Sequence, residues 1–166
     1  RESMLFAPAW AGGIAFTDYN TLVISVPPDD VETYRRGLVH ELAHLLVQEV
    51  SFNCFWDMPT WLNEGLASYS EGPLARFLEE ELDFAIRSRS LISVRSLSSN
   101  FPADRSHALR SYAQSNSIVT YLIEGYGWEK MRELLAVFGE GSTADDALRR
   151  VYGFDTEELD ALWREY

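Results

Sequence analysis

The sequence predicts an α+β fold in which helices form the majority and a small β-hairpin lies at the N-terminal end. Strand signals are confined largely to residues 5–26, and helix signals dominate from Asp30 onward. Hydrophobic residues make up 46% of the chain and aromatic residues 13%, which is typical of a globular protein. We expect one domain over residues 1–166. Because the chain begins at Arg1 without an initiator Met, we expect it to be a fragment of a longer protein.

The hairpin is predicted from two short apolar segments with turn residues between them. Gly12–Phe16 and Leu22–Val26 flank a turn at Asp18–Thr21. The prolines at 27–28 then end the second strand.

The first predicted helix runs to about Val50, with Asp30 or Thr33 as its cap. From Leu38 to Val47 it is apolar on nearly every side except at the polar residues of an H-E-x-x-H pentad. A helix that is apolar all round is typically buried. Burying two imidazoles and a carboxylate there costs on the order of several kcal/mol unless they are paired or bind a metal ion.

The later helices are marked by proline at their starts and by glycine between them. After an irregular aromatic link at 51–58, Pro59 is expected to open a helix over Thr60–Ser70. Pro73 is expected to open the next helix, which reaches Arg87–Arg89, and residues 90–106 are polar and turn-rich. Further helices are expected over His107–Gly125, Trp128–Phe138, Thr143–Val151 and Thr156–Tyr166.

The pentad His40-Glu41-Leu42-Ala43-His44 carries the chemistry. On a helix, His40 and His44 lie one turn apart on the same face, so both imidazoles can reach one metal ion. Glu41 points roughly 100° away from His40 but stays within reach of a metal-bound water. Glu64, in Trp61-Leu62-Asn63-Glu64-Gly65-Leu66-Ala67, is the candidate third ligand. Two histidines and one carboxylate leave a fourth tetrahedral position open, as in catalytic zinc sites, and these ligand types favour zinc.

These motifs resemble the gluzincin metallopeptidases, and most closely the minimal peptidase MA-like bacterial domains and the catalytic core of the zinc aminopeptidases. The resemblance covers residues 33–70 and extends more faintly over 112–122. It implies a zincin-like fold with an HExxH active-site helix. It further implies one Zn²⁺ held by His40, His44 and Glu64, with Glu41 as general base and Tyr112 as hydrogen-bond donor to the oxyanion.

The predicted function is a zinc-dependent metallopeptidase that hydrolyses peptide bonds by a zinc-activated water with Glu41 as general base. The chain lacks a G-A-M-E-N segment like the one that reads a free N-terminus in aminopeptidases, so an endopeptidase or unspecified peptidase is preferred. One alternative is a zinc-binding domain with latent or lost activity that acts as an interaction or regulatory module of a larger protein. Another is a helical scaffold with a chance pentad.

Metal-bound imidazoles usually donate their second N–H to a carboxylate or carbonyl oxygen. Ser68 stands where thermolysin-type enzymes have an aspartate, so Asn63 and Glu71 are the candidates for this role. His107, the one histidine outside the pentad, is expected at the surface at a helix start, with hydrogen bonding to substrate as the alternative.

Two further features are candidates for binding a peptide substrate. The strand at Gly12–Ala15 is a possible exposed edge for pairing with a substrate backbone, and an ordinary hairpin is equally compatible with it. Arg105 and Arg110 are expected to be surface arginines, with binding of a peptide carboxylate as the alternative.

A net charge of −12 argues against nucleic acid as a partner, because phosphate binding needs a basic surface. The expected partner is a peptide or protein substrate. No apolar run approaches the roughly 18 residues that span a bilayer, and no signal peptide is visible. The single cysteine, Cys54, excludes an intramolecular disulfide and is expected to pack as a small apolar residue. The sequence does not determine the cellular compartment, and one interpretation is an extracytoplasmic domain of a longer precursor.

Overall fold

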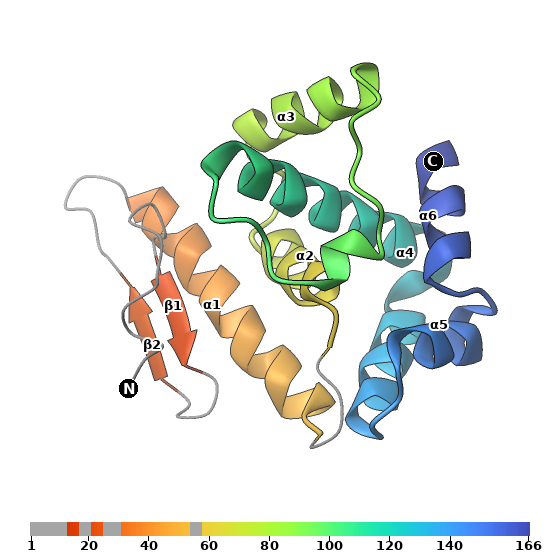
Figure 1. Ribbon diagram of the computed structural model, residues 1–166. Coiled ribbons are helices and arrows are strands. Elements are labelled where there is room, and N and C mark those ends of the chain that lie inside the picture. Colours follow the sequence, from red (N-terminus) through yellow and green to blue (C-terminus); the bar gives the residue numbers. More distant parts are fainter. Residues whose placement is uncertain (1–12, 17–20, 25–30, 54–57) are drawn as a thin grey trace.

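The computed structural model describes residues 13–16, 21–24, 31–53 and 58–166, and helices dominate it (Figure 1). None of the helices in these ranges combines the length and the apolar character that crossing a membrane requires. The predicted helical majority with a small N-terminal hairpin is confirmed. In chain order the elements are β1 (Gly13–Phe16), β2 (Thr21–Ile24), α1 (Val31–Ser51), α2 (Thr60–Ser70), α3 (Arg76–Arg87), η3 (Ser96–Ser98), α4 (Arg105–Gly139), α5 (Ala144–Tyr152) and α6 (Thr156–Glu165).

The two strands form the predicted antiparallel hairpin, with Gly13 opposite Ile24 and Phe16 opposite Thr21. The hairpin lies along α1 at the edge of the molecule (Figure 1). Gly12, most of the predicted turn and Cys54 fall outside the described residues, so the predictions on them stay predictions.

Helix α1 has nearly the predicted extent, and it contacts the hairpin, α2 and α4. Thr33 lies inside the helix and is not its cap, and Asp30 lies outside the described residues. The prediction that this helix is buried all round is wrong. Leu42, Leu46 and Val50 are 45%, 61% and 53% exposed, because no element of the described chain packs on the face that carries them.

Helix α2 begins directly after Pro59, as predicted, and packs between α1 and α4. Its contact with α4 depends on Gly65. A Cβ atom at this position would lie 2.5 Å from the Ser115 carbonyl oxygen and 2.6 Å from Val119 Cγ2. Glycine therefore permits an approach of the two helices that any side chain would push apart, and this approach fixes the position of the residue next to it, Glu64.

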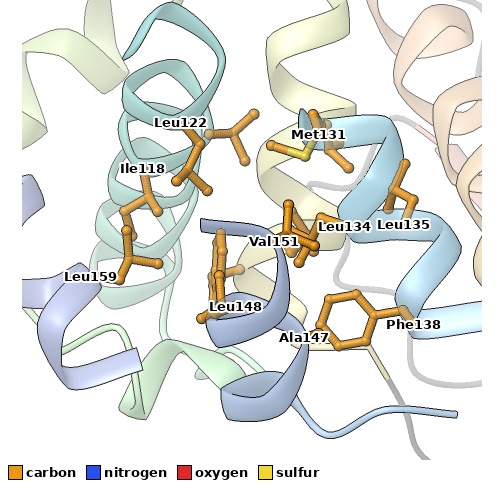
Figure 2. Close-up of a cluster of buried hydrophobic side chains, with 14 of the residues drawn as sticks. Ile118, Leu122, Met131, Leu134, Leu135, Phe138, Ala147, Leu148, Val151 and Leu159 are labelled. Atoms are coloured by element: carbon orange, nitrogen blue, oxygen red, sulfur yellow. The ribbon is translucent and has the colours of Figure 1, made fainter. Parts of the chain in front are cut away.

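Helix α4 is two helices joined at Gly127, whose φ of 85° and ψ of 161° are not helical. This is the predicted break between Gly125 and Trp128. Both halves of α4 pack with α5 and α6 around a common apolar cluster (Figure 2). The labelled members are Ile118, Leu122, Met131, Leu134, Leu135, Phe138, Ala147, Leu148, Val151 and Leu159.

The remaining predicted boundaries hold to within a few residues. Helix α3 begins at Arg76, later than a start at Pro73 would give, and ends at Arg87 as expected. The segment between α3 and α4 is tied down by Gln114, whose amide accepts from the Ile92 N–H and donates to the Ile92 carbonyl, both at 2.9 Å.

Candidate metal centre

Two neighbouring helices bring together His40, His44 and Glu64, which we call the ligand triad. The histidines lie one turn apart on α1, and Glu64 comes from α2. One potential ligand atom from each residue lies within 4.8 Å of the other two. The distances from Glu64 Oε2 to the Nε2 atoms of His40 and His44 are 3.5 Å and 3.6 Å. Tetrahedral ligands at zinc distances of 2.0–2.1 Å are separated by about 3.3–3.4 Å, so the two distances to Glu64 are close to the spacing that one ion requires.

One shielded oxygen of the partly buried Glu64 carboxylate supports the same interpretation. Its Oε2 atom is shielded from solvent and has no hydrogen-bond partner among the described residues. The two imidazole nitrogens beside it are at or beyond the limit for a hydrogen bond. A buried, unsatisfied carboxylate oxygen is destabilising, and buried polar atoms are normally paired. A cation bound between the three side chains would satisfy this oxygen, so the residues present fit a metal ion.

The second nitrogen of each imidazole is held by a hydrogen-bond acceptor. His40 Nδ1 lies 2.8 Å from Glu71 Oε1, and His44 Nδ1 lies 3.0 Å from Asn63 Oδ1. With Nδ1–H donating in both rings, Nε2 is the nitrogen of each imidazole that faces the Glu64 carboxylate and could bind a metal ion. Asn63 and Glu71 are thus confirmed as the partners that the sequence suggested. Ser68 is buried and accepts instead from Asn116 Nδ2 at 3.3 Å.

The electrostatic environment of His40 favours positive charge. Burial lowers the pKa of its imidazole, but interactions with the carboxylates of Glu64 and Glu71 outweigh this effect and raise the pKa to about 10. Two carboxylates on opposite sides of one ring therefore stabilise a cation at this position, a proton in the metal-free protein.

Glu41 and Tyr112, the other two predicted site residues, lie near the triad. Glu41 is 7% exposed, on the same helix as the histidines. Burial, then the charge of Glu64 and then that of Glu41 raise the pKa of the Tyr112 hydroxyl well above its usual range. Tyr112 is therefore protonated at neutral pH and close to both carboxylates. Its ring packs edge-on against Phe101, with centroids 5.2 Å apart.

The remaining candidates from the sequence, one histidine and two arginines, lie in the first turns of α4. His107 is exposed at the start of α4, and its Nδ1 is 2.8 Å from Oδ1 of Asp104, the N-cap residue, so the predicted helix-start surface histidine is confirmed. Arg110 donates to Glu81 at 2.9 Å and joins α4 to α3. Arg105 is an exposed residue at the first position of α4, as expected.

Sequence reasoning missed Arg36. Its Nε donates to Glu71 Oε2 at 3.2 Å, and its terminal nitrogen donates to the Pro73 carbonyl at 2.9 Å. The available signal was its position one helical turn before His40, on the same face of α1.

Comparison with known proteins gives one match. A family model described as the Peptidase MA superfamily matches residues 1–166. The chain matches no curated protein and no solved structure.

Proposed function

The chain belongs to the peptidase MA superfamily, and from this premise we propose that it is a zinc-dependent metallopeptidase that hydrolyses peptide bonds. The observation that carries the proposal is the convergence of His40, His44 and Glu64 within 4.8 Å of one another, with a buried glutamate, Glu41, beside them. Among the described residues Glu64 Oε2 has long contacts, 3.5 Å and 3.6 Å, to the two imidazoles, and a metal ion bound between them would coordinate this oxygen directly.

In this proposal the ligand triad holds one zinc ion. When bound, the ion supplies a Lewis acid that polarises the substrate carbonyl and lowers the pKa of water. Imidazole Nε2 atoms and a carboxylate are zinc ligands of the expected types, and three protein ligands are typical of catalytic rather than structural sites.

Glu41 and Tyr112 complete the proposed machinery. The Glu41 carboxylate takes a proton from the attacking water and passes it to the leaving amine. The Tyr112 hydroxyl donates a hydrogen bond to the substrate oxygen as that oxygen gains negative charge. The raised pKa of Tyr112 suits this role, because only the protonated phenol can donate. We prefer endopeptidase or unspecified peptidase action, because the chain has no G-A-M-E-N segment for a free N-terminus.

The test combines metal analysis with one substitution. Purified protein should hold about one equivalent of zinc and cleave peptides from a mixed fluorogenic library. Glu41→Gln should keep the zinc and lose hydrolysis by roughly 10²-fold or more, the scale of a general base. The matched control is Glu49→Gln, which removes the same charge from an exposed position of the same helix and should leave activity unchanged.

Two outcomes would contradict the proposal. Less than about half an equivalent of zinc, not restored by adding zinc, would exclude the metal site. Full zinc without turnover in the unmodified protein would replace the peptidase with a zinc-binding interaction or regulatory module.

A further inference from the structure

The two imidazoles of the ligand triad are oriented by acceptors of different kinds. Asn63 lies inside α2 and directly precedes Glu64, so the helix backbone holds it in place. Glu71 is the C-cap residue of α2, where the helix ends. It is followed by Gly72, whose φ of 99° turns the chain away. A glutamate side chain at the end of a helix has many rotamers to lose, so it needs a further contact to stay in one position.

Arg36 supplies that contact. Its guanidinium donates to the Glu71 oxygen that His40 does not use, at 3.2 Å, and to the Pro73 carbonyl on the far side of Gly72, at 2.9 Å. The side chains of Arg36 and Glu71 are only 25% and 21% exposed, so solvent competes weakly for both. The planar guanidinium of Arg36 therefore fixes both the Glu71 carboxylate and the turn at Gly72 that follows it.

We propose that Arg36 is a positioning residue that acts through Glu71 on His40. This inference rests on the zinc site of the proposed function. A guanidinium can only donate hydrogen bonds, so Arg36 holds the Glu71 carboxylate as an acceptor that faces His40 Nδ1. That interaction selects the tautomer with a free lone pair on Nε2 and sets the plane of the ring. Arg36 thus helps to orient a ligand that it does not touch.

The sign of the effect separates positioning from simple electrostatics. Loss of a positive charge near a cation site would by itself strengthen zinc binding or leave it unchanged. Loss of a positioning contact weakens it. Arg35 provides the matched control, because it is the neighbouring residue on the same helix, carries the same charge and forms an exposed ion pair with Glu32, its one ion-pair partner within the described part of the chain.

The experiment measures zinc affinity by chelator competition for the unmodified protein, Arg36→Gln, Arg35→Gln, Glu71→Gln and the Arg36→Gln/Glu71→Gln double variant. Arg36→Gln should weaken zinc binding about tenfold, the lower end of the range for outer-shell partners, and Arg35→Gln by less than about twofold. In the Glu71→Gln background, Arg36→Gln should have almost no further effect, because its route to His40 is already lost. The visible spectrum of the Co²⁺-loaded protein should change with Arg36→Gln and not with Arg35→Gln.

The inference is overturned if Arg36→Gln binds zinc as tightly as Arg35→Gln does. It is also overturned if Arg36→Gln weakens zinc binding by the same factor in the unmodified protein and in the Glu71→Gln variant. If Arg36→Gln does not fold in the metal-free state, Arg36→Lys replaces it in the same cycle with the same criteria. Zinc binding by the unmodified protein keeps the two proposals apart. If that protein binds no zinc, both fall, and if it binds zinc but the cycle shows no coupling, only the role of Arg36 falls.

Discussion

At the scale of single residues, environment assigns different tasks to identical side chains. His40 faces a carboxylate that is paired with an arginine, whereas His44 faces a neutral amide. Glu64 points an unsatisfied oxygen at both imidazoles, whereas Glu71 binds the outer side of one of them. In the proposed metal site the inner carboxylate is therefore a ligand and the outer one orients an imidazole.

The pKa of His40 predicts how the metal-free protein responds to pH. Its pKa is raised from 6.5 to about 10 in the folded state, so folding favours the protonated ring. The resulting stabilisation is fully present below pH 6.5 and is lost as the pH rises toward 10. Urea unfolding in EDTA should therefore show stability falling between pH 7 and 9. The fall should be smaller in His40→Gln, and equal slopes in the two proteins would contradict the assignment.

Tyr112 predicts a separation of catalysis from metal binding. Tyr112→Phe removes the proposed oxyanion donor but no metal ligand. We expect kcat to fall about 10²- to 10³-fold while the zinc dissociation constant stays the same. Tyr69→Phe is the control, because Tyr69 is a partly buried tyrosine that packs edge-on against Trp128 at 5.6 Å. Equal kcat values for Tyr112→Phe and the unmodified protein would remove Tyr112 from the mechanism.

The two histidines of the triad could be predicted as a pair from sequence because helix geometry is local, whereas Glu64 on α2 could be named only as a candidate. A spacing of four residues puts His40 and His44 on one face whatever the rest of the fold does. Glu71 could be named only as a candidate, and Arg36 was missed. Their contacts depend on how the end of α2 lies against α1, which residue spacing along one helix does not determine.

At the scale of elements, the close approach of α2 and α4 determines where Glu64 lies. Helix starts and breaks that are marked by a proline or a glycine could be predicted, as Pro59 before α2 and Gly127 within α4 show. How far α1 is buried could not be predicted. Hydrophobic residues on all sides of a helix indicate that it can be covered on all sides, but the elements that cover it come from the rest of the fold, and Leu42 and Leu46 are left exposed in the described chain.

Gly65→Ala tests this helix contact. The added methyl group would meet the Ser115 carbonyl at 2.5 Å, so the helices must separate. We expect a loss of about 1–3 kcal/mol in the free energy of unfolding, as for other overpacked sites, and weaker zinc binding because Glu64 moves with α2. Gly37→Ala on α1 is the control, because its Cβ would meet nothing within 4 Å and alanine favours the helix by about 0.5–1 kcal/mol. Equal stability for the two variants would show that α2 and α4 tolerate a side chain between them.

At the scale of the whole molecule, the apolar core and the proposed metal centre hold α1 to different extents. The buried apolar cluster joins α2, α4, α5 and α6, part of which Figure 2 shows, whereas the triad joins α1 to α2. Helix α1 contributes little to that cluster, since Val47 is its one member among the described residues. The attachment of α1 therefore depends more on its polar contacts with α2 than the attachment of the C-terminal helices does.

Zinc should for this reason stabilise the whole fold, and α1 most directly. An ion that binds the folded chain and not the unfolded one adds about 4 kcal/mol to the free energy of unfolding when free zinc is about 1,000 times its dissociation constant. Urea unfolding in zinc-buffered and EDTA solutions measures this gain. Hydrogen exchange should show the largest added protection around His40 and His44, with less change in α5 and α6.

Glu64→Ala removes one proposed ligand and should abolish most of this gain in the free energy of unfolding, because two imidazoles alone hold the ion weakly. A gain of the same size in Glu64→Ala would mean that zinc binds elsewhere on this acidic surface, and the α1–α2 crosslink would then have no part in stability.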